Sequence, residues 1–271
     1  MSRMRRRPGR GGPAHPAPAG PIVALAGVEK TYRTGRVAFP ALKGVDLAID
    51  PGEMVAIVGP SGSGKTTIVN LIAGIDRPTA GTVTVNGNRL DRMNEEQLAT
   101  WRGRTIGIVF QFFQLMPTLT ALENALLPLD LAKLGSGRQR TEAARRHLSL
   151  VGLGDRGDHL PSELSGGEQQ RVAIARAMAC EPKILLGDEP TGNLDTTTAR
   201  DMFGLLDGLH QAGTTVVFVT HDPALAALAE RVITVRDGLI VGDARRGAAG
   251  ARGAAAGGFE GPGAAGAAGV P

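Results

Sequence analysis

A glycine-rich loop between an apolar strand and a helix constrains the fold of this chain more than any other feature. Residues 59–67 read Gly-Pro-Ser-Gly-Ser-Gly-Lys-Thr-Thr and fit the pattern G-x-x-x-x-G-K-[ST]. Glycines let backbone N–H groups turn toward an anion, and a helix starting at about Lys65 adds the positive end of its dipole. The apolar run 53–58 before the loop and the helical pattern of 67–73 after it predict a strand–loop–helix unit. The loop is therefore predicted to bind the phosphates of a nucleotide.

Within this loop, Lys65 is expected to reach the β- and γ-phosphates, and the Thr66 hydroxyl is expected to ligate Mg²⁺. The alternative is a glycine-rich turn that binds nothing. The candidate nucleotide-binding residues of the loop are Gly59, Pro60, Ser61, Gly62, Ser63, Gly64, Lys65, Thr66 and Thr67.

The chain has 271 residues, of which 42% are hydrophobic, enough for a sizeable core and one or two domains. Its net charge is +4, yet residues 1–20 alone hold five arginines and no acid. The rest of the chain is therefore slightly acidic, and no nucleic-acid partner is expected. Cys180 is the only cysteine, which excludes an intramolecular disulfide and fits a reducing compartment.

The sequence contains no apparent signal peptide and no apparent transmembrane helix. Its longest apolar run without charge, residues 105–122, is interrupted by glutamines, threonines, a glycine and a proline, so it is a poor membrane span. If the protein works at a membrane, another chain has to supply the span.

Strands alternate with helices along residues 21–242, which predicts an α/β fold with a mainly parallel sheet. A hairpin signal at Asn86-Gly87 predicts an antiparallel β subdomain beside it. Helical spacing over about 112–167 predicts an inserted helical subdomain. Residues 1–20, which are basic, and 243–271, which are rich in glycine and alanine, are expected to be disordered.

A second constellation follows 123 residues after Lys65, where an apolar strand ends in Asp188 and Glu189. Because the carboxyl ends of parallel strands meet at one edge of a sheet, these acids are expected near the loop. Asp188 is the candidate Mg²⁺ ligand, and Glu189 is the candidate group that orients or deprotonates the attacking water.

Between the two lies a third element, Leu164-Ser-Gly-Gly-Glu-Gln-Gln-Arg171. Ser165, Gly166 and Gly167 stand at a predicted helix N-terminus and form a second candidate anion site. Both anion sites can serve one nucleotide if two subunits pack head to tail.

This set of motifs resembles the nucleotide-binding domain of ABC ATPases, whose signature motif is similar to residues 164–171. The resemblance covers about residues 21–242, and its elements occur in the order of that family. It implies a P-loop NTPase fold, the cofactors ATP and Mg²⁺, and a homodimer that sandwiches two Mg-ATP molecules.

The resemblance also implies roles for individual residues. Tyr32 matches the aromatic residue that stacks on adenine, and Gln111 matches the glutamine that senses Mg²⁺ and couples to the membrane partner. Asp195 matches an aspartate of the dimer interface, and His221 matches the histidine that contacts the γ-phosphate. The alternatives are a packed core tyrosine and a structural histidine.

Residues 190–195, 110–117 and 120–124 resemble the lipoprotein-release and macrolide-export group of this family. This implies a separate integral membrane permease as partner and a peripheral location at the cytoplasmic face of the cell membrane. One alternative is a cell-division ATPase that moves no solute. The other is a soluble relative for DNA repair, chromosome handling or translation, but such relatives carry coiled coils, zinc modules or two cassettes, which are absent from this sequence.

Overall fold

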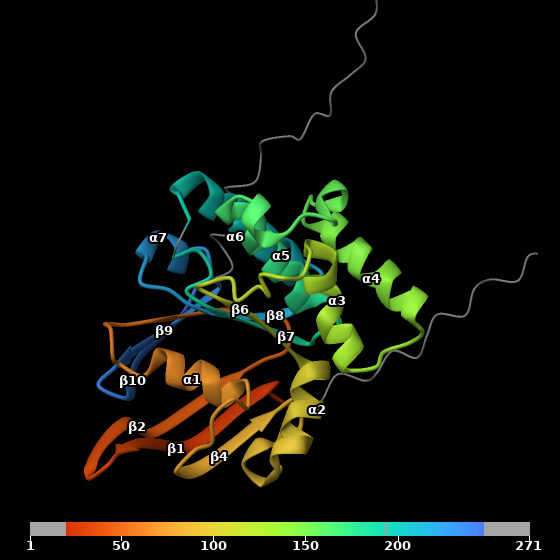
Figure 1. Cartoon of the computed structure of the whole chain (residues 1–271). Helices are drawn as coiled ribbons and strands as arrows, with labels where there is room; N and C mark the ends of the chain where they lie inside the picture. The colour runs from red at the N-terminus through yellow and green to blue at the C-terminus, as the bar shows by residue number, and fades with distance from the viewer. Residues whose placement is uncertain (1–19, 193, 247–271) are drawn as a thin grey trace, which may run out of the picture.

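A six-stranded sheet forms the centre of the computed structural model, which describes residues 20–192 and 194–246. The strand order is β10-β9-β3-β8-β7-β6, and all neighbours are parallel except β10 and β9 (Figure 1). The mainly parallel sheet predicted from the alternating pattern is thereby confirmed. The strands are β3 (Met54–Val58), β6 (Ile106–Phe110), β7 (Ile184–Asp188), β8 (Thr215–Val219), β9 (Arg231–Arg236) and β10 (Leu239–Arg245).

A second, antiparallel sheet has the order β2-β1-β4-β5 and confirms the predicted antiparallel subdomain. Its strands are β1 (Val23–Thr34), β2 (Val37–Ile49), β4 (Ala80–Val85) and β5 (Asn88–Arg89). Asn86 and Gly87 form the expected turn, both at positive φ. The hairpin of β1 and β2 includes the exposed segment 37–40, which shows no alternation that would identify a strand.

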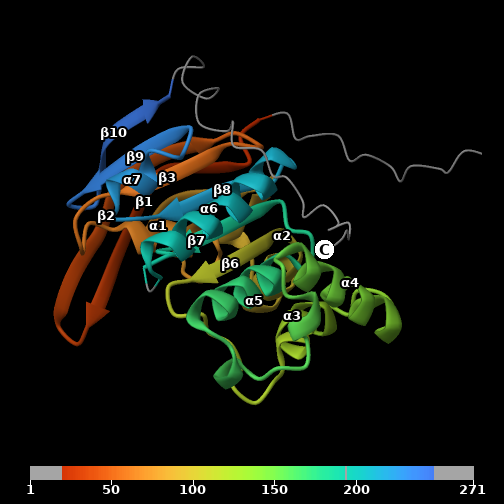
Figure 2. The same ribbon diagram turned by 90° about the horizontal axis from the view of Figure 1, so that it is seen from above.

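The central sheet is buried on both faces, and alternate residues of its strands feed two hydrophobic clusters. Val55 and Ile57 of β3 point to the antiparallel sheet and to α1 (Lys65–Ile72). Met54 and Ala56 of the same strand point to the helices of the opposite face. The result is the layered arrangement seen in Figures 1 and 2.

The helices over the second face include the predicted helical insertion, which lies beside β6 (Figure 2). Thr120 and Ser136 cap α3 and α4 with capping boxes, and Asn94 and Gln97 form the capping box expected for α2. Of the described helices, α2 (Glu95–Thr105) packs on the first cluster. The helices α3 (Ala121–Leu131), α4 (Gly137–Leu150), α5 (Gly166–Met178), α6 (Thr196–Gln211) and α7 (Pro223–Ala226) pack on the second.

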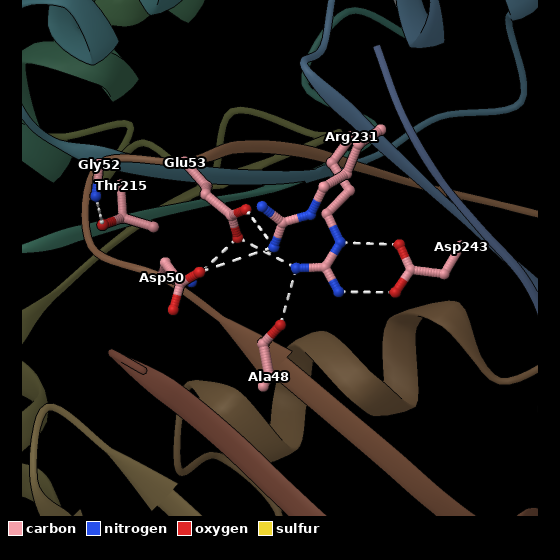
Figure 3. Close-up of polar contacts among 8 residues, drawn as sticks. Ala48, Asp50, Gly52, Glu53, Thr215, Arg231 and Asp243 are labelled. Atoms are coloured by element: carbon pink, nitrogen blue, oxygen red, sulfur yellow. Dashed lines mark hydrogen bonds and ion pairs between the residues drawn. The ribbon is translucent and has the colours of Figure 1, made fainter. Parts of the chain in front are cut away.

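An ion-pair network around Arg231 joins the two sheets (Figure 3). The guanidinium, in a side chain only 7% exposed, makes two hydrogen bonds to Asp243 of β10, at 2.7 and 2.6 Å. It also donates to the Ala48 carbonyl of β2 at 2.7 Å and to Glu53, just before β3, at 3.1 Å. Asp243 holds the pKa of Arg231 above its ordinary value. One buried cation therefore ties the antiparallel subdomain to the edge of the central sheet.

The strand β10 runs to Arg245, so sheet pairing continues past the domain boundary expected at residue 242. The tails predicted to be disordered otherwise lie largely outside the described residues. Over the part of the chain that the structure describes, no helix combines the length and the hydropathy needed to span a bilayer.

Candidate functional site

The phosphate loop lies where the sequence predicted it, between the end of β3 and the start of α1. A Cβ added to Gly59 would lie 2.0 Å from the Val235 carbonyl oxygen, and one added to Gly64 would lie 2.7 Å from that of Ala41. Both glycines also have positive φ, at 150° and 108°. No other residue type fits these two positions without moving the neighbouring backbone.

The Lys65 ammonium folds back over the loop and donates to the carbonyl oxygens of Gly59 and Pro60, each at 2.9 Å. A side chain that is 8% exposed thus places its charge at the centre of the loop. The Ser63 hydroxyl is buried and has no hydrogen-bond partner among the described residues. The loop therefore offers a cation and an unused hydroxyl to an incoming anion.

Asp188 lies at the carboxyl end of β7, next to the loop, as predicted. The Thr66 hydroxyl donates to its carboxylate at 3.2 Å. Burial raises the pKa of Asp188, and the neighbouring Glu189 adds to the effect, whereas Thr66 and Lys65 oppose it. The Thr66 hydroxyl and the half-buried Asp188 carboxylate are oxygen ligands of the kind that Mg²⁺ prefers.

Glu189 and His221 face each other directly after β7 and β8. The His221 Nδ1 atom lies 3.2 Å from a carboxylate oxygen of Glu189. Glu189 adopts a left-handed backbone conformation with φ 48°, and its N–H donates to the Val219 carbonyl at 3.1 Å. The two side chains line a pocket of about 260 Å³ together with Gly192 and Thr220. Unusual backbone conformations of this kind occur often at active sites.

Gln111 follows β6, whose last residue, Phe110, is paired with Asp188. The Gln111 amide packs on Gly192, where an added Cβ would lie 3.0 Å from its nitrogen. Gln111 therefore belongs to the same group as Asp188 and Glu189, at the carboxyl edge of the sheet.

Ser165 caps α5, and its hydroxyl accepts a hydrogen bond from the N–H of Glu168. Gly167 sits so close to α6 that an added Cβ would lie 2.7 Å from the Thr198 side chain. Asp195 caps α6. Within the described ranges, no hydrogen bond or ion pair connects residues 165–167 with the phosphate loop. These contacts therefore do not join the two candidate anion sites within the described chain.

Tyr32 lies on β1, and its side chain is 38% exposed, so it is not the packed core tyrosine of the alternative interpretation. Its hydroxyl donates to Asp76 at 2.7 Å. Burial raises its pKa, and the Thr67 hydroxyl of the phosphate loop acts in the opposite direction. An aromatic ring therefore stands beside the first turn of α1.

Sequence reasoning missed two residues of α5 that hold the site together. The Arg176 guanidinium donates to the carbonyls of Phe113 and Gln114, the former at 2.8 Å, and thereby fixes the segment after Gln111. The Gln170 amide donates to the carbonyl of Pro190, next to Glu189. Their acceptors are backbone carbonyls, which no side-chain pattern reveals.

Comparisons with known proteins agree with this geometry. A family model described as ABC transporter matches residues 42–192. The lipoprotein-releasing system ATP-binding protein LolD of Anaeromyxobacter dehalogenans is 48% identical over 226 residues, covering 83% of this chain and 95% of that protein. The macrolide export ATP-binding/permease protein MacB of Rhodopirellula baltica is 48% identical over 227 residues, covering 83% of this chain and 33% of that protein.

Among solved structures, the chain is similar to an ATP-binding cassette captured as a dimer in a post-hydrolysis state bound to ADP and Pi. The TM-score is 0.78 and the identity 44%, covering 83% of this chain and all of that one.

The fold and the site together define a P-loop nucleoside triphosphatase. Within that class, the chain belongs to the ABC transporter family, in the lipoprotein-release and macrolide-export group. It is the ATP-hydrolysing component of a transporter, and the cell-division alternative is not favoured.

Proposed function

We propose that two copies of this chain sandwich two Mg-ATP molecules and drive a separate integral membrane permease of the lipoprotein-release or macrolide-export type. One observation carries this proposal. The contact between Thr66 and Asp188 and the contact between Glu189 and His221 lie together at the carboxyl edge of the sheet.

In this proposal, residues 59–67 bind the triphosphate, and Lys65 turns from the loop carbonyls to the β- and γ-phosphates. Thr66, Asp188 and Gln111 hold Mg²⁺, which when bound neutralises charge on the phosphate oxygens. Among the described residues, no group of three or more His, Cys, Asp or Glu side chains is placed to hold a metal ion.

Glu189 orients the attacking water and accepts its proton, while His221 contacts the γ-phosphate and fixes the Glu189 carboxylate through the 3.2 Å contact. Catalysis is then mostly positioning and charge stabilisation. Ser165, Gly166 and Gly167 contact the γ-phosphate bound to the other subunit. Their separation from the loop within one chain supports this arrangement.

The permease meets the segment that follows Gln111. Phe112 and Met116 in this segment expose 66% and 46% of their surface. Exposed large apolar side chains that lie close together often mark a binding surface for a partner protein. In this proposal, the permease holds the chain at the cytoplasmic face of the cell membrane.

The substitution Glu189→Gln tests the catalytic assignment. Because the amide cannot accept the proton of water, hydrolysis should fall by about 10²- to 10⁴-fold while ATP binding is retained. Phosphate release and ATP affinity are measured in parallel. The exposed Glu181, which pairs with Arg146 on the surface, supplies the control Glu181→Gln, and that variant should hydrolyse ATP normally. Equal rates in both variants would remove Glu189 from the mechanism.

A further inference from the structure

The side chains of Asp76 and Lys30 hold the ring of Tyr32. Asp76 accepts a hydrogen bond from the Tyr32 hydroxyl at 2.7 Å, forms an ion pair with Lys30 and accepts from the Arg77 N–H at 2.7 Å. The Lys30 ammonium lies 4.8 Å from the centre of the Tyr32 ring and also donates to the Arg77 carbonyl at 2.8 Å. The ring is therefore held at its hydroxyl and along one face.

The charged pair is sheltered from solvent. The side chains of Lys30 and Asp76 are 13% and 24% exposed. Burial alone would raise the pKa of Asp76, but hydrogen bonds from Lys30, Tyr32 and the Arg77 backbone outweigh it and hold that pKa below its usual value. The Asp76 carboxylate therefore accepts hydrogen bonds from three partners. Because this ion pair is partly buried, salt screens it less than it screens the exposed ion pairs of the surface.

These residues come from two separate parts of the chain. Lys30 and Tyr32 lie two residues apart on β1, whereas Asp76 follows α1, the helix that begins in the phosphate loop. The Thr31 N–H donates to Thr79 at 2.9 Å and adds a second link between the same two segments. The position of the ring is therefore set relative to the phosphate loop.

We infer that Lys30 and Asp76 are positioning residues for the adenine base, which hold the Tyr32 ring beside the phosphate loop with one face covered by the ammonium and the other presented to the base. This inference rests on the proposed function, in which Tyr32 stacks on adenine.

Its physical basis is preorganisation. A free tyrosine ring has to be ordered when the base binds, and that entropy cost is avoided when hydrogen bonds and a cation–π contact already hold it. This gain in binding free energy applies only to the adenine base of the nucleotide. The triphosphate is bound by residues 59–67 in the proposed function, whereas the Lys30 ammonium interacts with Asp76, the Arg77 carbonyl and the Tyr32 ring. Loss of the pair should weaken binding of the nucleoside part and leave binding of the phosphate chain unchanged.

The test measures the affinity of the full chain for a non-hydrolysable ATP analogue and for inorganic tripolyphosphate, both with Mg²⁺. Lys30→Met keeps the alkyl stem, Asp76→Asn keeps the shape, and Tyr32→Phe keeps the ring but removes its hydroxyl. Each should weaken binding of the analogue by about threefold to tenfold. In Lys30→Met and Asp76→Asn, tripolyphosphate affinity should stay at the wild-type value, which also shows that these two variants are folded. Tyr32→Phe is compared for the analogue only, because the Tyr32 hydroxyl also meets Thr67 of the phosphate loop.

A matched control comes from the same subdomain, where Arg89 and Asp91 form a 2.7 Å ion pair away from Tyr32. Asp91→Asn should change neither affinity. A double-mutant cycle adds Lys30→Met to Tyr32→Ala, and the second substitution should then have no further effect, because Lys30 acts through the ring.

Two results would overturn the inference. One is wild-type affinity for the analogue in Lys30→Met and Asp76→Asn while Tyr32→Ala binds it more weakly. The other is an equal loss of analogue and tripolyphosphate affinity. If instead Tyr32→Ala itself binds the analogue as well as the wild type does, the adenine assignment of the proposed function fails, and the inference fails with it.

Discussion

The half-buried Asp188 carboxylate is the candidate Mg²⁺ ligand, and its burial lowers the stability of the protein when it is ionised. Its pKa is raised chiefly by burial, so the folded protein binds this proton more tightly than the unfolded chain does. The stability that it contributes is therefore fully present below its unfolded pKa and is lost as the pH rises through the folded pKa. At neutral pH the buried, ionised carboxylate lowers the free energy of unfolding, and a bound cation would offset this cost.

The variant Asp188→Asn should consequently unfold at a higher temperature than the wild type at about pH 7 without nucleotide or Mg²⁺, and the gain should shrink toward about pH 4. The amide can still accept the hydrogen bond of Thr66. Hydrolysis should fall by on the order of a hundredfold or more, because the amide is a poor Mg²⁺ ligand. Thermal midpoints across this pH range and phosphate release check both parts. A destabilised variant at neutral pH would contradict this description of Asp188.

For single residues, the sequence predicted the positions that belong to a motif but not the residues whose contacts hold those positions in place. Lys65, Thr66 and Asp188 stand in patterns whose spacing implies their chemistry, and the structure brings them together. Lys30 and Asp76 are 46 residues apart, and Arg176 binds backbone carbonyls. Such contacts depend on the completed fold and leave no local pattern.

Among the elements, prediction succeeded where burial is periodic and failed where it is not. The central strands are apolar runs buried on both faces, and the helices α2 and α6 begin at recognisable caps, so the sequence revealed them. Burial in the strand β2 alternates only from Val45 onward, and its exposed first part has no pattern that identifies a strand. The contact between its end at Ala48 and Arg231 could not be foreseen, since it joins two sheets.

The variant Arg231→Met tests that junction. Removing the guanidinium leaves Asp243 and Glu53 without their buried partner, so the free energy of unfolding should fall by about 3 kcal/mol. Arg138→Met breaks a pair in which Arg138 is 89% exposed and should cost less than about 0.5 kcal/mol. Denaturant titration measures both. The network lies at the amino ends of β3 and β9, away from the phosphate loop, and ATP affinity should therefore persist in both. Equal losses of stability would show that the network does not join the sheets.

For the whole molecule, the essential feature is that one chain holds two candidate anion sites and no described hydrogen bond or ion pair links them. The phosphate loop and residues 165–167 lie on different elements and are not linked within the described chain. In the proposed head-to-tail dimer, each loop would meet residues 165–167 of the partner. Gly166 offers a clean probe of this arrangement, because it is exposed at the start of α5 and an added Cβ would meet nothing closer than Phe113 at 3.7 Å.

The most direct test of the central claim is the mass of Glu189→Gln in solution with Mg-ATP, compared with the double variant Glu189→Gln/Gly166→Asp. An aspartate at a helix N-terminus favours the helix but repels a phosphate. The account predicts a dimer for the first protein, a monomer for the second, and equal ATP affinity of the two monomers. A monomer in both cases, or weaker ATP binding by the Gly166→Asp monomer itself, would contradict the claim that two subunits share each nucleotide.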